Sequence, residues 1–413
     1  MKQVNNIFSS AEIFLPDWEK VCPETWSVIA CDQFTSSPDY WQQAETLVGD
    51  APSALKLILP ELYLEQPGLQ DRIFVIQDTM KNYLEQGILK AYDNAMIYTE
   101  RVQSNGVLRT GVIGKFDLEA YDYHPESQSP VRATEATVLE RIPPRMQVRE
   151  KALLELPHIM ILINDEQKTV IEACGMQKQE MQLLYDTDLM LGGGHVSGWL
   201  MNENQQKDFQ ERLQNLLKDA GNLQFAMGDG NHSLATAKAC YEKLKQEHPE
   251  EDFSQHPARY ALAELVNLHS QALEFEAIHR IVTETSPAHL LEYLTEHLEL
   301  SETPSEQQII ILQGTEQKKY YIHKPCSALA VGSLQNQLDN YLKQYPGKID
   351  YIHGIQTVAQ LAQKPDSIGF LLPDMDKNSL FSSVEKDGVL PRKTFSTGHA
   401  EDKRYYMECR KIR

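Results

Sequence analysis

Residues 223–244 read LQFAMGDGNHSLATAKACYEKL, and this segment decides the expected fold. Residues 223–227 form a short apolar run that is typical of a buried strand. After the polar turn that follows, apolar side chains recur at steps of three and four residues, as on one face of a helix: Leu234, Ala237, Tyr241 and Leu244. The segment therefore predicts a strand, a tight turn and a helix. Strands and helices alternate in the same way through the middle of the chain, which predicts a mixed α/β (α+β) fold.

The turn itself gathers several functional groups. It carries the carboxylate of Asp229, the amide of Asn231, the imidazole of His232 and the hydroxyl of Ser233. A strand, a glycine turn and a helix together present unpaired backbone N–H groups and the positive end of the helix dipole to an anion. We therefore predict that the amides from Gly230 to Ser233 bind phosphate. The alternative is a packing turn in which Asp229 or Ser233 only caps the helix. The glycine spacing matches neither GxxxxGK[ST] nor GxGxxG.

Composition restricts the partners of the chain. Its 413 residues contain 39 Lys and Arg against 59 Asp and Glu, a net charge of −20. Such a surface repels nucleic acid and anionic membranes, so we expect a small-molecule substrate instead. There is no long uncharged apolar run and no signal-peptide pattern at the start, and the six cysteines show no paired spacing. These features predict a cytoplasmic protein with reduced cysteines; they leave the oligomeric state open.

The chain is long enough for two or three domains. We expect an N-terminal mixed α/β region over residues 1–130, a core with the phosphate-binding turn over 131–300, and a C-terminal mixed α/β region over 301–413. Within these regions the pattern predicts helices over 71–89, 202–220 and 287–300, a hairpin around Ser104-Asn105-Gly106, and strands within 153–164, 260–267, 309–313, 318–322 and 368–372.

A second group of polar residues precedes the turn. It begins with Glu135 and continues with arginines at every fourth position, Arg141, Arg145 and Arg149. This spacing would place the arginines on one helical face, although two adjacent prolines interrupt a continuous helix there. Arginine suits bidentate recognition of phosphate or carboxylate, and the alternative is a solvated basic face.

Three more positions are candidates with simpler alternatives. His195 follows a triple glycine, which predicts a flexible loop that could cover a ligand, or else a surface turn. Arg280 follows His279 at the end of an apolar stretch, where a structural role is the alternative. Asp32 follows a short apolar run, where a strand-end carboxylate could bind metal or substrate.

Several segments in one order, among them VIACDQF, MGDGNHSLATA and VLPRKTFSTGHAEDKRYYMECRKI, make the chain resemble the DUF1015 family along nearly its whole length. The commonest form of that family's central motif reads DGHHR, so Asn231 and Ser233 stand here in place of a histidine and an arginine. This turn is similar to the phosphate-binding turn of the ParB/sulfiredoxin superfamily, which includes a kinase that phosphorylates free serine. The resemblance implies a ParB/sulfiredoxin-like core and nucleotide-phosphate chemistry.

On that basis we expect a phosphotransferase that uses ATP or ADP with Mg²⁺ and acts on a small hydroxylated metabolite, best represented by free serine. Asp229 or Glu135 would deprotonate the acceptor or hold the metal, whose ligands stay open, and His232, Arg145 and Arg280 would stabilise negative charge. The expected phosphate- or substrate-binding residues are Gly230, Asn231, Ser233, Arg145, Arg280 and His195. The alternatives are a phosphatase of a phosphomonoester such as phosphoserine, and a regulator that binds a nucleotide or metabolite without turnover.

Overall fold

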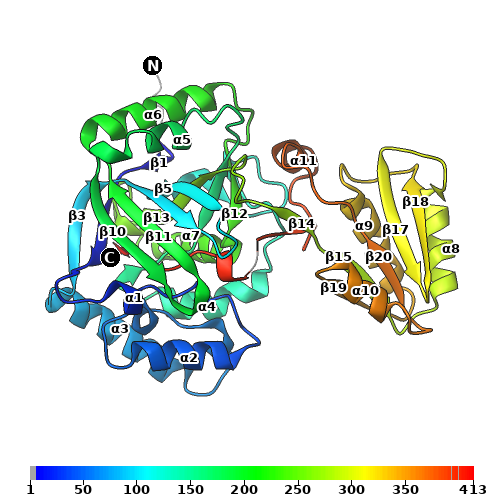
Figure 1. The fold of residues 1–413 in the computed structure, drawn as a ribbon, viewed down its shortest axis with the longest axis horizontal. Helices are drawn as coiled ribbons and strands as arrows, with labels where there is room; N and C mark the ends of the chain where they lie inside the picture. The colour runs from blue at the N-terminus through cyan, green and yellow to red at the C-terminus, as the bar shows by residue number, and fades with distance from the viewer. Residues whose placement is uncertain (1–5, 392, 399) are drawn as a thin grey trace. The chain divides into compact units, whose positions relative to one another are not determined.

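The computed structural model describes residues 6–391, 393–398 and 400–413. The chain is divided into two compact units (Figure 1). Unit 1 comprises the described parts of Met1–Ala133, Thr137–Leu273 and Gly398–Arg413, and unit 2 comprises Thr134–Ala136 and Glu274–Thr397. The expected mixed α/β fold is confirmed. The division differs from the three expected regions, because the first two of them share one sheet.

That sheet is the centre of unit 1. Its ten strands run in the order β10-β11-β4-β5-β13-β9-β12-β7-β6, with β1 paired to β5. The strand before the turn, β12, is antiparallel to β9, and β9 is parallel to β13. Hydrogen bonds between β5 and β13 join the region before residue 130 to the region after it. The strands are β1 (Phe8–Ser9), β4 (Ile97–Val102), β5 (Leu108–Asp117), β6 (Tyr121–Asp122), β7 (Val131–Arg132), β9 (Met160–Ile163), β10 (Gln182–Leu189), β11 (Gly194–Leu200), β12 (Phe225–Asp229) and β13 (Tyr260–Asn267).

Helices cover both faces of this sheet (Figure 1). Successive strand residues point to opposite faces, so Ile97 and Leu262 join one core while Tyr98 and Ala261 join the other. The first core includes side chains of α1 (Pro23–Trp26), α2 (Pro38–Val48) and α3 (Leu69–Glu85), and the second includes side chains of α5 (Ile171–Gly175), α6 (Glu203–Lys218) and α7 (Asn231–Glu247). The helix expected over 202–220 is α6, and Asn202 begins it with a capping box.

The prolines at 143 and 144 mark the start of a helix. They lie in the first turn of α4 (Ile142–Arg149), whose N-cap is Arg141, so no continuous α-helix carries all three arginines. Proline is tolerated there, where its missing N–H would have no partner within the helix. Arg145 and Arg149 therefore lie one turn apart on one short helix.

The end of the chain returns to unit 1. Two small sheets pair β2 (Ala11–Pro16) with β3 (Leu89–Ala95), and β22 (Arg410–Lys411) with β8 (Leu154–Glu155). The β22–β8 pair fixes the C-terminal segment beside the strand that leads into β9. Residues near 403 and 406 thereby reach the interior of unit 1.

Unit 2 is built on a six-stranded sheet in the order β16-β18-β17-β20-β15-β19, with a separate pair β14–β21. Its main core contains Leu290, Leu294 and Leu298 from the expected helix near 287 together with strand residues such as Phe370. The elements are β14 (Phe275–Ala277), β15 (His279–Thr283), α8 (Pro287–Leu298), β16 (Leu300–Ser301), β17 (Gln307–Gln313), β18 (Glu316–Ile322), α9 (Ala330–Leu342), β19 (Lys348–Ile352), α10 (Ile355–Leu361), β20 (Ile368–Leu371), α11 (Ser379–Asp387) and β21 (Phe395–Thr397).

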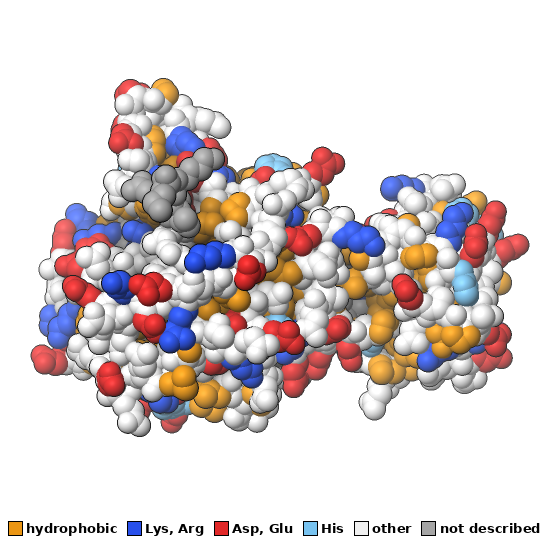
Figure 2. Space-filling model, turned by 90° about the horizontal axis from the view of Figure 1, so that it is seen from above, with side chains coloured by type: hydrophobic (Ala, Val, Ile, Leu, Met, Phe, Trp, Pro, Cys, Tyr) orange, Lys and Arg blue, Asp and Glu red, His pale blue; other side chains and the backbone are white. Residues whose placement is uncertain are grey.

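The surface agrees with the acidic composition. Figure 2 shows Asp and Glu side chains over the visible face of each unit, interspersed with Lys and Arg. Among the described residues, no helix is both long and apolar enough to cross a membrane.

Candidate functional site

The turn between β12 and α7 has the geometry that the sequence predicts. Gly230 adopts the left-handed conformation with φ of 77° and is the N-cap of α7. A Cβ at this position would lie 3.0 Å from the Cα of Ile159, so glycine is required by both conformation and space. The alternative of a capping side chain is confirmed in part, because the carboxylate of Asp229 accepts a hydrogen bond from the N–H of Gly230, the N-cap residue. The first-turn N–H groups have no partner within the helix and are the groups that bind anions in other proteins.

Asp229 lies at the end of β12 and is paired with a lysine from the C-terminal segment. Its Oδ1 accepts a hydrogen bond from the N–H of Gly230 at 2.8 Å, and its Oδ2 lies 3.1 Å from Nζ of Lys403. Burial opposes ionisation of this carboxyl, but Lys403, His158 and the Gly230 N–H outweigh burial and hold the pKa of Asp229 below its usual value. The site therefore contains an ionised aspartate and a lysine beside the start of α7.

Ser233 makes a second polar contact. Its hydroxyl lies 2.9 Å from Nε2 of His158, and Nδ1 of the same ring lies 2.8 Å from the hydroxyl of Tyr406. Oδ2 of Asp32 lies 3.7 Å from Nε2 of His158, so the strand-end carboxylate considered from the sequence reaches this imidazole. The result is a histidine with a hydroxyl on each ring nitrogen and a carboxylate beside one of them.

The other two turn residues face neighbouring backbone or the interior. Nε2 of His232 accepts a hydrogen bond from the N–H of Val138 at 3.4 Å, and the His232 carbonyl accepts one from Thr236. Oδ1 of Asn231 is buried and accepts no hydrogen bond from the described residues. The turn thus presents one polar atom, on Asn231, whose hydrogen-bonding capacity is not used by the described part of the chain.

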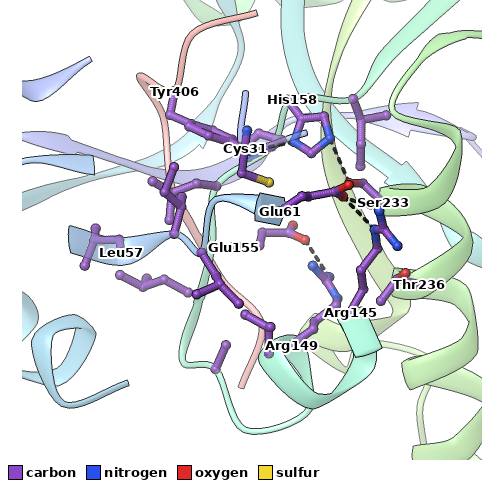
Figure 3. Close-up of a pocket in the computed structure, with 18 of the residues that line it drawn as sticks. Cys31, Leu57, Glu61, Arg145, Arg149, Glu155, His158, Ser233, Thr236 and Tyr406 are labelled. Carbon is purple, nitrogen blue, oxygen red and sulfur yellow. Dashed lines mark hydrogen bonds and ion pairs between the residues drawn. The ribbon is translucent and has the colours of Figure 1, made fainter. Parts of the chain in front are cut away.

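A cavity of about 140 Å³ adjoins Ser233 and His158 (Figure 3). Two arginines of α4 reach it, each held by a glutamate: Nε of Arg145 lies 2.7 Å from Oε1 of Glu61, and an Nη of Arg149 lies 2.5 Å from Glu155. Most of the remaining lining is apolar: Leu57, Ile58, Leu59, Leu64, Met80, Val148, Ala152, Leu154, Leu156, Pro157 and Ile159. The expected phosphate ligand Arg145 therefore lines the cavity, with its guanidinium already paired to Glu61.

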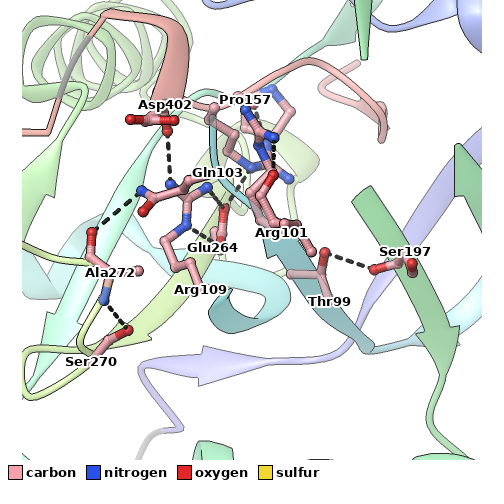
Figure 4. Close-up of polar contacts among 12 residues, drawn as sticks. Thr99, Arg101, Gln103, Arg109, Pro157, Ser197, Glu264, Ser270, Ala272 and Asp402 are labelled. Atoms are coloured by element: carbon pink, nitrogen blue, oxygen red, sulfur yellow. Dashed lines mark hydrogen bonds and ion pairs between the residues drawn. The ribbon is translucent and has the colours of Figure 1, made fainter. Parts of the chain in front are cut away.

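The C-terminal segment that carries Lys403 and Tyr406 is held by a buried ionic network (Figure 4). Glu264 on β13 contacts both Arg109 of β5 and Arg404, at 3.3 and 3.1 Å. Burial opposes ionisation of Glu264, but the two guanidinium groups hold its pKa below the usual value. The neighbouring Asp402 accepts a hydrogen bond from the N–H of Ser104 at 2.7 Å. These contacts fix the residues on either side of Lys403 relative to the sheet.

Two predicted site residues belong to unit 2. Glu135 accepts a hydrogen bond from the N–H of Thr394 at 3.3 Å, and burial raises the pKa of Glu135 although Lys393, Thr394 and Arg280 favour its charged form. Arg280 is fully buried and donates to Oε1 of Gln335 at 3.1 Å and to the Lys393 carbonyl at 2.9 Å. Their roles in a centre shared with Asp229 and His232 remain predictions.

His195 does not lie at the turn. It is in strand β11, five strands from β12 in the same sheet, which corresponds to roughly 24 Å at ordinary strand spacing. The expectation of a flexible loop at GGGH is also wrong, because these residues turn directly from β10 into the paired strand β11. The His195 ring instead lies 2.7 Å from Asp188 and 2.9 Å from Asp186. Burial alone would lower the pKa of His195, but these hydrogen bonds outweigh it and raise the pKa.

The described residues contain a group of side chains that could share a metal ion, but it lies away from the turn. One group of three has ligand atoms close enough to share an ion, His248, Glu250 and Glu251, and it lies at the surface after the end of α7, away from the turn. A dedicated metal site of three such side chains at the turn is therefore not found in that part of the chain.

Sequence reasoning missed His158, Lys403 and Tyr406. His158 immediately precedes the apolar run that forms β9, and Lys403 and Tyr406 lie in the motif DKRYY near the end of the chain. Two signals were available in the sequence. One was a polar residue, His158, at the start of a buried strand, and the other was the charged motif DKRYY, which ends in two tyrosines. Neither signal indicates which distant segment the residue contacts.

Comparison with known proteins defines the family. The model of the family described as "Protein of unknown function (DUF1015)" matches residues 17–341, and the chain belongs to this family. No curated protein matches the chain.

Solved structures give distant likenesses. A free serine kinase mutant in complex with AMP has a TM-score of 0.40 and 10% identity, over 69% of this chain and 90% of that chain. SbnI with a C-terminal truncation, from Staphylococcus aureus, has a TM-score of 0.38 and 10% identity, over 69% and 82%. A conserved hypothetical protein from Pyrococcus furiosus has a TM-score of 0.35 and 9% identity, over 67% and 95%. These similarities are too low to support a function for this chain.

Proposed function

We propose that this chain is a nucleotide-dependent phosphotransferase that transfers phosphate from ATP or ADP to the hydroxyl of a small metabolite. The observation that carries the proposal is the β12–α7 turn, where the N-terminus of α7 adjoins the Asp229–Lys403 pair and the Ser233–His158 contact. Free serine is the first candidate acceptor, because the sequence of the turn resembles that of a superfamily that includes a free serine kinase.

The transferring phosphate would lie at the start of α7. Its oxygens would accept hydrogen bonds from first-turn N–H groups, and Nζ of Lys403 would add a positive charge. Asp229 would hold Lys403 in place through the 3.1 Å contact and would remain ionised. Because its pKa is lowered, Asp229 is better suited to this positioning role than to accepting a proton.

The proton of the acceptor would pass to His158. The acceptor oxygen forms a bond to the terminal phosphorus of the nucleotide, the bond from that phosphorus to the nucleotide's bridging oxygen breaks, and the hydroxyl proton moves to Nε2 of His158. Asp32, 3.7 Å from that nitrogen, would stabilise the imidazolium. The hydroxyl of Ser233, which lies 2.9 Å from the same nitrogen, marks a position that an acceptor hydroxyl could take.

Mg²⁺ fits this arrangement as part of the nucleotide complex. Mg²⁺ is usually held by substrate phosphates and only one or two carboxylates, and Asp32 and Asp229 are the carboxylates that contact the turn and His158. The ion would neutralise charge on the phosphates. This need for few protein ligands agrees with the lack of a three-ligand cluster at the turn among the described residues.

The test is direct phosphate transfer. The protein is incubated with Mg²⁺, ATP or ADP, and serine, and ³¹P NMR follows the appearance of a phosphomonoester. The expected result is transfer that Lys403→Gln reduces at least 100-fold, since a charge at the phosphate is lost, while Lys81→Gln on the exposed face of α3 has no effect. Hydrolysis of phosphoserine without a nucleotide would identify a phosphatase instead. Nucleotide binding without turnover, with an acceptor pool present, would identify a regulator.

A further inference from the structure

The cavity beside Ser233 and His158 is larger and more apolar than a serine side chain requires. On this measure a water molecule needs at least about 10–15 Å³, so the cavity of about 140 Å³ has room for roughly ten water molecules. An apolar cavity of about this size is known to bind a benzene molecule in another protein. The size therefore leaves room for a ligand group with several carbon atoms.

The lining separates into three chemical zones. Figure 3 shows His158 and Ser233 at one end and Arg149 toward the other, with the Glu61–Arg145 pair between them. The remaining surface is mainly the apolar side chains of the segment before α3, of α3 and α4, and of residues 152–159. Several of them are buried, including Leu57, Met80 and Leu154. A ligand that filled the cavity would place polar groups toward Ser233 and Arg149 and an apolar group against the remaining lining.

The end of the cavity at Arg149 has N–H donors that could bind an anion. Each of the three guanidinium nitrogens of Arg145 already has a partner, either Glu61 or the Arg141 carbonyl. Arg149 contacts Glu155 through one nitrogen, and its Nε and other Nη make no hydrogen bond within the described part of the chain. Glu155 is also paired with Arg410 at 2.7 Å, so its charge does not depend on Arg149 alone. Arg149 therefore has more N–H groups without a partner than Arg145 and is the arginine better able to bind a ligand carboxylate.

We infer that the cavity binds the acceptor, and that the acceptor is a hydroxy acid with a large apolar substituent. This inference rests on the proposed function. The hydroxyl of the acceptor reaches His158, its carboxylate binds Arg149, and its apolar substituent fills the space lined by Leu57, Met80 and Leu154. Serine would be the smallest member of this class and would leave most of the cavity empty.

The test compares serine with threo-3-phenylserine, which adds a phenyl group to the same hydroxyl, amine and carboxylate. With ATP or ADP and Mg²⁺, kcat/KM for phenylserine should be at least about tenfold higher, since a filled apolar pocket discriminates by that factor or more. Ala152→Leu, which fills the cavity, should lower kcat/KM for phenylserine more than for serine and so reverse the preference. Arg149→Met should raise KM for both acceptors at least about tenfold, whereas Arg212→Met on exposed α6 should not.

The outcomes separate the two proposals. The inference is overturned if kcat/KM for serine equals or exceeds kcat/KM for phenylserine and Ala152→Leu changes neither value. The proposed phosphotransferase activity would stand in that case. If neither compound accepts phosphate, the proposed function fails, and isothermal calorimetry decides the cavity assignment. The cavity assignment is supported if the parent protein and Arg212→Met bind phenylserine and Ala152→Leu does not. It is overturned if the parent protein does not bind phenylserine.

Discussion

The Asp229–Lys403 pair gives the sharpest prediction for stability and turnover together. Asp229→Asn keeps an oxygen that can accept the Gly230 N–H but leaves Lys403 without its carboxylate. The two side chains are 22% and 14% exposed, so the pair lies between the exposed and the buried limits. Breaking an exposed pair costs about 0–1 kcal/mol and breaking a buried one about 3–5 kcal/mol, so we expect a loss of about 2 kcal/mol. For a unit of this size that is a fall of roughly 3–4 °C in Tm.

A double-mutant cycle isolates the interaction. Asp229→Asn, Lys403→Gln and the double variant are compared by urea unfolding at pH 7 and by phosphate transfer. The double variant should lose less free energy of unfolding than the two single variants lose together, because neither partner is then left alone. The difference, which is the coupling energy of the pair, should be about 1–2 kcal/mol. All three should lose transfer. Strictly additive losses, or full transfer in Asp229→Asn, would refute the role assigned to this pair.

Two further predictions concern Gly230 and His195. Gly230→Ala should destabilise the protein by about 2–3 kcal/mol, because it combines a left-handed φ with a contact to Ile159, whereas Gly106→Ala, with similar φ and open space, should lose only about 1–2 kcal/mol in the same urea titration. For His195, a raised folded-state pKa means stability that is fully present below the unfolded-state pKa of about 6.5 and is lost as pH rises through the folded-state pKa. The Tm of the parent should therefore exceed that of His195→Gln by more at about pH 5.5 than at about pH 8.5, with phosphate transfer unchanged; a constant difference would contradict the assignment.

Local features of the fold were accessible from the sequence. The strand and helix around GDGNHS, the hairpin between β4 and β5 at Ser104-Asn105-Gly106, and the helix begun by Asn202 depend on residues close together in the chain. Periodicity and turn chemistry report such local structure well. The prolines at 143 and 144 also mark where α4 begins, since proline interrupts a helix interior but is accepted in a first turn.

The partners of the turn could not be predicted in the same way. Ser233 and His158 are 75 positions apart, and Lys403 reaches Asp229 from the other side of unit 2 in the sequence. Such contacts depend on the order of strands in the sheet and on the return of the C-terminal segment, which periodicity does not encode. The same limit explains His195, whose position after a triple glycine suggested a loop over a ligand, although the strand order places it five strands away from the turn.

The most direct test of the central proposal is a crystal structure with Mg²⁺ and a non-hydrolysable ATP analogue. We predict phosphate oxygens within about 2.7–3.2 Å of backbone nitrogens in the first turn of α7, with Nζ of Lys403 beside them. The terminal phosphate should face the side of the turn where Ser233 and His158 meet the cavity. An analogue bound with its phosphates away from α7, or a first turn of α7 left empty at saturating analogue, would contradict the proposal.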